Sequence, residues 1–394
     1  MLVRSDRYLI PDMSPVYKAG DEFFRQFEVQ NMNPRERFVR VLTGKEVDRA
    51  PFIKVFGGAN WVVAKWLDTY PHLNTYIDEL LGFEGPNRGW AYPPVNMRLC
   101  GVPPDVVVYE SETEKRVRHG DGSLSVQISR DGHFFNHITE YPMKCGDDWQ
   151  KIKENWLNPD DPRRFPKGWR HYIDMYNARD YPLILFCDGV YGFIRKLFGD
   201  EVLGLMFYDD PGLVKDIINT YLSMCIAIWE KMIPDIQFDA ISCWEDMSYK
   251  SGSIISIKHF DEFLAPHYRR IREFAEAAKI PIVLVDSDGN IMELAKWMYE
   301  AGVNCMFPFE VQSGNDIPRI RRELPGMGCI GGLNKECMAK DRAAMDAELD
   351  KARRLIPLGR YIPGPDHSVL ENVPFENYEY FMRGLKSIII GTGI

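Results

Sequence analysis

Two aspartates stand at the end of an apolar, β-branched run in the segment IPIVLVDSDGNIMEL, residues 280–294. They are Asp286 and Asp288, and a helical pattern begins shortly after them. The apolar run predicts a buried strand, so both carboxylates are expected where that strand meets the next helix. Two like charges that face one site raise the pKa of one of them, which makes it a candidate proton donor. The alternative for Asp288 is a capping role at the helix start.

Other side chains with chemical potential follow the same pattern, because each comes at the end of a predicted strand. They are Asn60, Asp188, Glu245, Asp246, Glu310, Asn334, Asp366 and His367. Surface ion pairing is the alternative role for Glu245 and Asp246, and a structural loop position is the alternative for His367. Aromatic residues near the first strand and in the segment that follows it could line an apolar pocket, although most aromatic side chains belong to the core. These are Trp61, Trp66, Trp90 and Tyr92.

Short apolar runs alternate with helical patterns from residue 180 onward. The runs are YPLILFCDG, FDAISCWED, IPIVLVDSDG, GVNCMFPFE, MGCIGGLN, GRYIPGPDH and SIIIGTG, and the helices are expected at 211–232, 257–278, 291–301, 314–323 and 342–356. With a strand near Pro51 this makes about eight β units, and near-continuous apolar strands are typical of a parallel sheet. The sequence therefore predicts an α/β fold, a (β/α)8 barrel of the TIM type, whose chemistry lies at the carboxyl ends of the strands. A doubly wound sheet is the alternative, but no GxGxxG follows any predicted strand.

The predicted organisation has a helical lead-in at residues 1–50 and the barrel at 51–394, with a β insertion at about 80–165. In the lead-in, Asn33 as N-cap, Pro34 at the first helical position and Gly44 as a stop predict a helix. In the insertion, alternating segments on either side of residues 119–122 predict an antiparallel hairpin placed to fold over the site.

Composition excludes several classes of protein. The formal charge is −9 and there is no basic block, so nucleic acid is not expected as a partner. No apolar run of about 18 residues is present, so no membrane span is expected, and the first residues do not resemble a signal peptide. Eight cysteines without a CxxC pair favour reduced core thiols and a cytoplasmic enzyme.

Six segments resemble the uroporphyrinogen decarboxylase superfamily, in the expected order over roughly residues 31–390. They are NPRERFVRVLTGKEVDRAP, YDDPGLVKDII, SGSIISIKHFDEFLAPHYRRI, DSDGNI, GGLNKECM and IPGPDHSVLENVPFENYEYF. The resemblance implies a distorted (β/α)8 barrel and one of two chemistries. One is decarboxylation of acetate side chains on a tetrapyrrole without a cofactor. The other is methyl transfer to or from the cobalt of a corrinoid, usually on a separate protein.

One departure from that family favours methyl transfer. The decarboxylase lines its site with arginines soon after the first strand, because bidentate pairs with arginine match a substrate that carries many carboxylates. The corresponding stretch here, FIKVFGGANWVVAKWLDTYPHL, contains no arginine and offers Asn60, Trp61 and Trp66 instead. The methyltransferase branch is therefore expected.

A second departure concerns zinc. The thiol-methylating branch of the family has a His-x-Cys after one strand and a Cys after a later strand as its zinc ligands, and the resemblance places Asp286, Asp288 and His367 at those positions. Without thiolates, activation of a thiol substrate is not expected. A set of oxygen and nitrogen ligands could hold a harder Zn²⁺ or act without metal.

These observations predict a corrinoid-dependent methyltransferase that demethylates a small substrate, best guessed as an aromatic methyl ether, and passes the methyl group to a cobalamin-type corrinoid on a partner protein. The expected catalytic residues are Asp288, His367, Glu310 and Glu245. The expected substrate contacts are Asn60, Trp61, Trp90, Tyr92, Asp188, Tyr191 and Asn334. The candidate metal ligands are Asp286, Asp288 and His367. A homodimer stays open, as do two other functions: a cofactor-free decarboxylase or lyase, and a non-catalytic protein that binds a corrinoid or tetrapyrrole.

Overall fold

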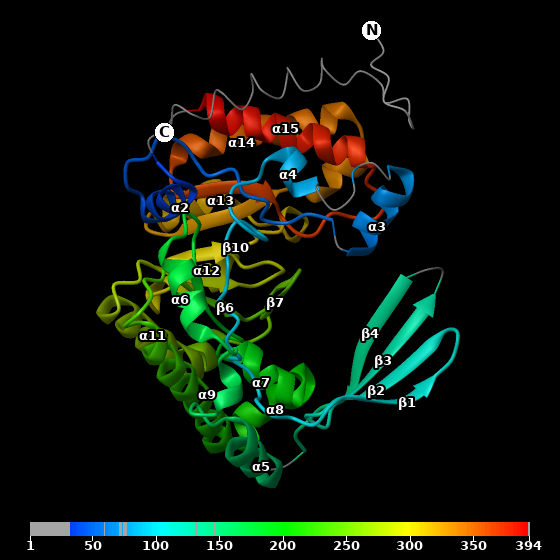
Figure 1. Cartoon of the computed structure of the whole chain (residues 1–394), viewed down its shortest axis with the longest axis vertical. Helices are drawn as coiled ribbons and strands as arrows, with labels where there is room; N and C mark the ends of the chain where they lie inside the picture. Colours follow the sequence, from blue (N-terminus) through cyan, green and yellow to red (C-terminus); the bar gives the residue numbers. More distant parts are fainter. Residues whose placement is uncertain are drawn as a thin grey trace.

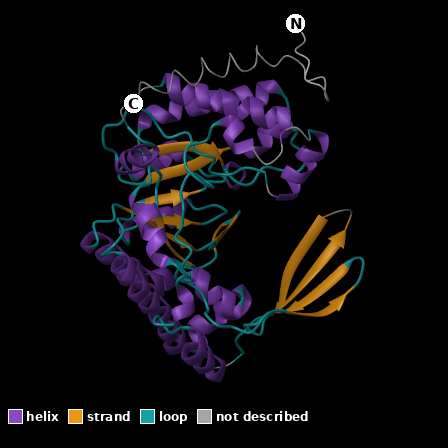
Figure 2. Ribbon diagram, in the orientation of Figure 1, coloured by secondary structure: helices purple, strands orange, loops and turns teal. Residues whose placement is uncertain are grey.

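The computed structural model describes residues 32–392, apart from positions 59, 71–72, 74–76, 131–132 and 145. Its centre is a six-stranded parallel sheet in the order β12-β11-β10-β9-β6-β5 (Figures 1 and 2). The strands are β5 (Ile184–Cys187), β6 (Ala240–Trp244), β9 (Ile282–Asp286), β10 (Cys305–Phe307), β11 (Gly328–Leu333) and β12 (Tyr361–Pro365). Their side chains are almost all buried, which explains why each strand reads as a continuous apolar run.

Helices lead from each of these strands to the next or follow the last. They are α7 (Tyr191–Phe198), α8 (Asp200–Asp209), α9 (Pro211–Met232), α10 (Ile257–His259), α11 (Ala265–Ala277), α12 (Met292–Glu300), α13 (Ile317–Glu323), α14 (Arg342–Leu355) and α15 (Phe375–Gly391). Figure 1 shows α14 and α15 at one end of the molecule and α9 and α11 at the other. Parallel strands that follow one another in the chain and are joined by helices are the arrangement that the sequence predicted.

Two of the eight predicted strands are absent from the described sheet, and that part of the prediction is wrong. Near Pro51 the backbone forms only an isolated bridge between Gly58 and Val369, because Val55 adopts a left-handed conformation, with φ at 53°, that breaks an extended run. The run SIIIGTG belongs to the end of α15, where its isoleucines continue the buried face of an amphipathic helix.

Two segments that are not strands flank the edges of the sheet. Val369 N–H donates to Gly57 O beyond β12, and Ala91 bridges to Leu183 at the start of β5. Val55 N–H donates to Arg88 O over 3.0 Å, which links the two segments to each other. The α/β class and the parallel sheet are confirmed.

The predicted helix of the lead-in is confirmed as α2 (Pro34–Thr43). Asn33 Oδ1 accepts from the N–H of Glu36, and the Glu36 carboxylate accepts from the N–H of Asn33, which forms a capping box. Gly44 ends the helix with φ at 68°. The remainder of the lead-in, residues 1–31, lies outside the described residues.

The β insertion is a four-stranded antiparallel sheet that projects from the body as an arm (Figures 1 and 2). Its strands are β1 (Val106–Glu110), β2 (Glu114–Arg118), β3 (Leu124–Arg130) and β4 (His133–Glu140). The predicted hairpin joins β2 to β3. At its turn His119 bonds Asp105 through Nδ1 and Ser125 through Nε2, both over 2.8 Å, so this histidine ties the entry of the arm to its third strand.

Shorter elements complete the described chain. They are α3 (Asn60–Thr69), α4 (Ile77–Leu81), α5 (Gly146–Trp156), η2 (Pro162–Arg164), α6 (Trp169–Asn177), β7 (Ser248–Tyr249), β8 (Gly252–Ser253), η3 (Phe260–Leu264), η4 (Val311–Ser313), η5 (Lys335–Ala339) and η6 (Ile356–Leu358). Within the described residues, no helix is both long and apolar enough to cross a membrane.

Candidate functional site

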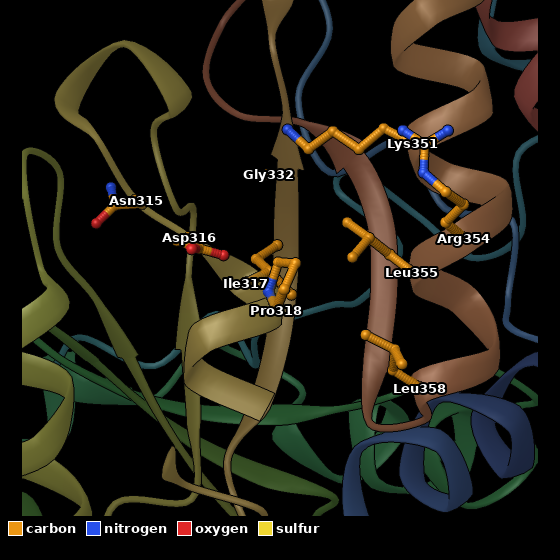
Figure 3. A pocket seen from close by; sticks show the side chains of 9 residues that line it. All are labelled: Asn315, Asp316, Ile317, Pro318, Gly332, Lys351, Arg354, Leu355 and Leu358. Atoms are coloured by element: carbon orange, nitrogen blue, oxygen red, sulfur yellow. The ribbon is translucent and has the colours of Figure 1, made fainter. Parts of the chain in front are cut away.

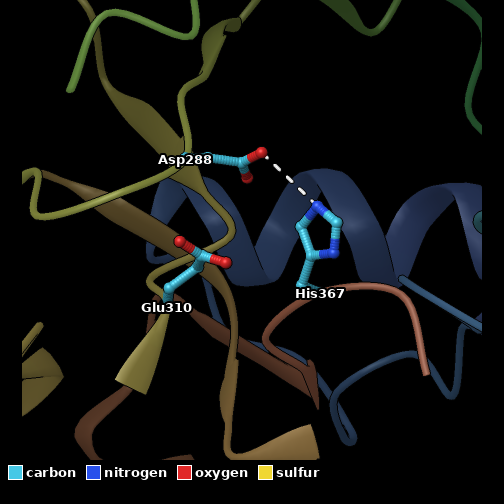
Figure 4. Close-up of side chains that lie close together, drawn as sticks. All are labelled: Asp288, Glu310 and His367. Carbon is cyan, nitrogen blue, oxygen red and sulfur yellow. Dashed lines mark ion pairs between the residues drawn. The ribbon is translucent and has the colours of Figure 1, made fainter. Parts of the chain in front are cut away.

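Three predicted site residues meet where strands of the sheet end. Asp288 follows β9, Glu310 follows β10 and His367 follows β12, and one ligand atom from each lies within 4.8 Å of the other two (Figure 4). His367 Nε2 is 3.4 Å from Asp288 Oδ2. All three side chains are partly exposed, so a solute can reach them. Parallel strands place their carboxyl ends at one edge, and this brings residues far apart in sequence together.

Asp366 links the ends of β10, β11 and β12 to one another. This aspartate is buried, and its carboxylate accepts from the N–H of Val311 over 2.8 Å and from the N–H of Lys335 over 2.9 Å. Val311 follows Glu310 directly, and His367 follows Asp366 directly. Burial raises the pKa of Asp366, and the two N–H donors oppose that shift. Asp366 therefore fixes the positions of Glu310 and His367 relative to each other.

A second set of hydrogen bonds connects Glu310 to the loop that carries Asp288. Glu310 Oε2 accepts from the N–H of Gly289 over 2.9 Å. Asn315 Nδ2 donates to the carbonyl oxygens of both Gly289 and Glu310, over 2.8 and 2.9 Å. Gly289 has φ at 79°, and a Cβ there would come within 2.4 Å of Ser248 O, so only glycine fits this turn. The other carboxylate oxygen of Glu310, Oε1, forms an ion pair with Lys335 Nζ at 3.6 Å.

Three residues of the site were missed in the sequence: Phe56, Arg88 and Lys335. The His367 ring stacks on Phe56, with centroids 5.1 Å apart, and the Arg88 guanidinium lies over the same ring at 4.2 Å. Arg88 Nη1 is 4.0 Å from Asp286 Oδ2. Arg88 lies in a loop, and the sequence around it does not resemble a strand. The sequence pattern therefore did not predict that Arg88 lies near these residues. The position of Lys335 directly after Asn334 was the one available signal for it.

Asp286 does not belong to the group of three, and its predicted role as a metal ligand is wrong for this arrangement. It ends β9 and faces Arg88 instead. Desolvation raises the pKa of Asp286 to about 7; Arg88 opposes this shift, and Asp288 and Asp246 add to it. One of the two neighbouring aspartates thus has a raised pKa, but the main cause is desolvation, and the expected repulsion by Asp288 is a smaller contribution.

Replacing Asp286 by asparagine is expected to stabilise the fold at pH 8 and to have little effect near pH 4. The folded pKa of about 7 lies above the ordinary value of 3.8, so ionisation of Asp286 opposes folding. This cost begins as the pH rises above about 4 and is complete above about 7, at a few kcal/mol, since one pKa unit corresponds to about 1.4 kcal/mol. Urea unfolding between pH 5 and 8 measures it, with exposed Asp209→Asn as the control. A stability difference that does not change with pH would contradict the prediction.

Glu245 was predicted to be catalytic, but its surroundings give it a structural role. It is fully buried, and its two oxygens accept from the N–H groups of Val190, Tyr191 and Gly192 over 2.6–2.8 Å and from the hydroxyl of Tyr268. The carboxylate thus pairs the free N–H groups at the start of α7. Desolvation raises its pKa to about 7 against these four donors. No oxygen is left to meet a substrate.

Several of the predicted substrate contacts have structural roles instead. Trp90 and Tyr191 are wrong, because both are buried in the core: Trp90 packs against Phe307 at 5.8 Å, and the Tyr191 hydroxyl donates to Asp200. Asn334 is used as the N-cap of η5, where it accepts from the N–H of Glu336.

Asp188 is also unavailable to a substrate directly. It is buried and paired with Arg98 and Lys196. The side chains of Asn60 and Trp61 lie outside the described residues.

Tyr92 lines a cavity of about 440 Å³ together with Pro93, Val95, Asn96, Met97, Arg98 and Phe186. A second cavity, of about 410 Å³, lies between α13 and α14 (Figure 3). Its walls include Ile317, Lys351 and Arg354, and none of the predicted site residues lines it. Of these two cavities, only the Tyr92 cavity is lined by a predicted site residue.

Comparison with known proteins finds one matching family and several similar solved structures. The family model of uroporphyrinogen decarboxylase (URO-D) matches residues 177–388. Among solved structures, a methyltransferase from Methanosarcina mazei has a TM-score of 0.56 and 14% identity, covering 91% of this chain and 98% of that one. A B12-independent methionine synthase from Shewanella sp. W3-18-1 has a TM-score of 0.34 and 12% identity, covering 56% of this chain and 65% of that one.

A comparison with curated proteins finds no match. The likeness to the M. mazei structure concerns the fold. The family model spans more than half of the chain and includes all six strands of the parallel sheet. The chain belongs to the uroporphyrinogen decarboxylase (URO-D) family.

Proposed function

We propose that this protein is a methyltransferase that takes the methyl group of a small aromatic methyl ether and delivers it to the cobalt of a corrinoid on a partner protein. The convergence of Asp288, Glu310 and His367 at the strand ends carries the proposal, because these groups can assist the departure of an oxygen. Membership of the URO-D family supports it. We also infer that segments 51–58 and 84–91 complete a barrel around this mouth, supported by their backbone links to β12, to β5 and to each other.

The residues of the site act on the leaving oxygen. When bound, a reduced corrinoid supplies Co(I), a strong nucleophile toward the methyl carbon. The bond between the methyl group and oxygen breaks, and the departing phenolic oxygen takes a proton from His367. Asp288, 3.4 Å from His367 Nε2, orients the imidazole. Phe56 fixes the plane of the ring by stacking. Protonation is needed because an unprotonated oxygen is a poor leaving group.

The same three side chains fit a divalent cation. Two carboxylates and one imidazole form an oxygen and nitrogen donor set, which suits Zn²⁺ and harder cations better than a set that relies on thiolates. Glu310 can offer Oε1, since Oε2 is taken by Gly289. Bound there, a cation would supply Lewis acidity toward the substrate oxygen. The nearby ammonium of Lys335 would weaken its binding.

Zinc is expected to raise the unfolding temperature of the wild-type protein and not that of His367→Ala. A ligand that binds only the folded state stabilises it by about 2.7 kcal/mol at 100 times its dissociation constant. Thermal unfolding with and without ZnCl₂, together with metal analysis after dialysis, measures this. His171→Ala, on the exposed surface of α6, is the control. Equal shifts for wild type and His367→Ala would exclude zinc from this site and leave proton donation as the role of His367.

The function is tested by mixing the purified protein with a Co(I) corrinoid protein and a panel of methoxylated aromatic compounds. The expected result is the absorbance change of a methylated corrinoid together with one phenol per methyl group transferred. No transfer from any methyl donor, with carbon dioxide released from a carboxylic acid instead, would overturn the proposal.

A second function is favoured by one observation. The stretch after the first predicted strand contains no arginine, but Arg88 brings a guanidinium close to Asp286 and Phe56. Within the described part of the chain, this guanidinium donates no hydrogen bond. An arginine in that position could bind a substrate carboxylate, as a cofactor-free decarboxylase requires. This alternative predicts activity without corrinoid and loss of that activity in Arg88→Gln. Tight binding of a corrinoid or tetrapyrrole without turnover would instead indicate a binding protein.

A further inference from the structure

The Tyr92 cavity has the shape and lining of a site for one aromatic ring. Its volume of about 440 Å³ falls within the usual range for small-molecule sites, roughly 300–1,000 Å³. Tyr92 and Phe186 meet edge to face with centroids 5.5 Å apart, so a planar ligand finds aromatic surfaces there. Val95 and Met97 add apolar surface from the same loop.

Tyr92 links the cavity to Asp286 and Arg88. The Tyr92 hydroxyl accepts a hydrogen bond from Trp90 Nε1 over 2.9 Å. Desolvation raises the pKa of Tyr92, the charge of Asp286 adds to that shift and Arg88 opposes it. The hydroxyl is thus close enough to Asp286 and Arg88 to feel their charges. Arg88 in turn lies over the Phe56 ring on which His367 stacks, so a chain of contacts leads from the cavity to His367.

An arginine with free donors stands at the rim of this cavity. Arg98 bonds both oxygens of Asp188 through Nε alone, at 3.0 and 3.1 Å. Its two Nη atoms donate no hydrogen bond to any described residue, and 62% of the side chain is exposed. Lys196 Nζ lies 2.7 Å from the same Asp188. Two cations therefore share one carboxylate, which leaves a surplus of one positive charge at the rim.

The wall that carries Arg98 is held in a fixed conformation. Buried Arg164 donates from Nη1 to the carbonyl oxygens of Asn96 and Arg98, over 2.8 and 2.9 Å. The Tyr221 hydroxyl donates to Met97 O over 3.2 Å. A wall held by buried hydrogen bonds does not have to become ordered when a ligand binds, so less affinity is lost.

We propose that this cavity binds the ring of an aromatic carboxylate, with the carboxylate paired to the free Nη atoms of Arg98. Arginine can present two parallel N–H donors to the two oxygens of a carboxylate. The surplus positive charge at the rim favours an anionic substituent over a neutral one of the same shape. This inference rests on the proposed function, whose substrate class it narrows to methoxylated benzoates.

Calorimetric titration with 4-methoxybenzoate and its neutral analogue 4-methoxybenzamide tests the proposal without any corrinoid. The wild-type protein is expected to bind the carboxylate at least about 10-fold more tightly, as suits a charged hydrogen-bonded pair. Arg98→Gln is expected to abolish this preference and Arg98→Lys to retain part of it. Arg319→Gln is the matched control, since Arg319 is 53% exposed and pairs through Nε with Glu323 over 2.7 Å on the distant helix α13. The control should keep the wild-type preference.

Each other outcome would overturn the proposal. Equal binding of the two ligands by the wild-type protein would show that charge is not recognised. A preference that survives in Arg98→Gln but disappears in Arg88→Gln would place the carboxylate at Arg88. The proposed reaction is tested separately: if the Arg98-dependent preference is observed and no methyl group is transferred, the binding site stands and the methyltransferase proposal fails.

Discussion

Replacement of His367 by glutamine is expected to lower the rate of methyl transfer by about 10²- to 10⁴-fold, the usual contribution of a positioned general acid. Glutamine cannot protonate the departing oxygen, although it keeps a polar group near Asp288. The initial rate of corrinoid methylation measures the effect, with substrate and corrinoid protein at saturating concentrations. His171→Gln, on the exposed surface of α6, should retain the wild-type rate.

Substrates with different leaving groups can distinguish two roles of His367, that of a proton donor and that of a residue that only supports the fold. A nitrophenolate ion departs without protonation far more readily than an unsubstituted phenolate. The deficit of His367→Gln should therefore be much smaller with 4-nitroanisole than with anisole. The same large deficit for both substrates, or a loss of less than about 3-fold with anisole, would contradict general acid catalysis by His367. Asp288→Asn changes a residue that positions His367, so it should reduce the rate less than His367→Gln does.

The parts of the fold that depend on local signals were predictable from sequence. Asn33, Pro34 and Gly44 determine the ends of α2 through hydrogen bonds between near neighbours in the chain. The six buried strands were recognisable because burial on both faces requires a continuous apolar run. The meeting of Asp288 with His367 followed from strand topology alone, since parallel strands present their carboxyl ends together.

What could not be predicted depends on partners distant in sequence. Glu245 and Glu310 are the same residue type, and each follows a strand of the sheet. Glu245 is buried and accepts from four donors, whereas Glu310 is partly exposed and pairs with Lys335. The difference arises from Tyr268 and the start of α7 in one case and from Gly289 in the other. The run SIIIGTG reads equally well as strand or helix, and only packing against the body decides.

The β insertion was expected to fold over the site, but it projects from the body as an arm. Four residues of β1, from Val106 to Tyr109, are about half exposed, so the body of the protein does not cover this strand. Apart from Phe186 of β5, the residues that line the Tyr92 cavity come from the loop before the arm instead. The insertion thus contributes to the candidate site through its base, which Arg164 fixes, and not through its strands.

Replacement of Glu245 by leucine is expected to lower the free energy of unfolding by about 4 kcal/mol or more. Leucine has a similar size but accepts no hydrogen bond, so three N–H groups at the start of α7 and the Tyr268 hydroxyl lose their acceptor. Each buried donor left unpaired costs about 1–3 kcal/mol. Burial raises the pKa of Glu245 to about 7, so the ionised carboxylate is unfavourable in this environment. Its removal in the leucine variant offsets part of the cost of the unpaired donors. Urea unfolding at pH 8 measures the difference.

Glutamine at the same position provides the intermediate case. Its amide oxygen can still accept, while its NH₂ group faces donors, so a smaller loss is expected for Glu245→Gln than for leucine. Exposed Glu293→Leu on α12 is the control and should stay within about 0.5 kcal/mol of the wild-type value. The comparison also decides between a structural and a catalytic carboxylate. If Glu245→Gln unfolds at the wild-type urea concentration and yet transfers no methyl group, Glu245 is a catalytic residue. A destabilised variant whose folded molecules keep their activity establishes it as the group that anchors α7 to the sheet.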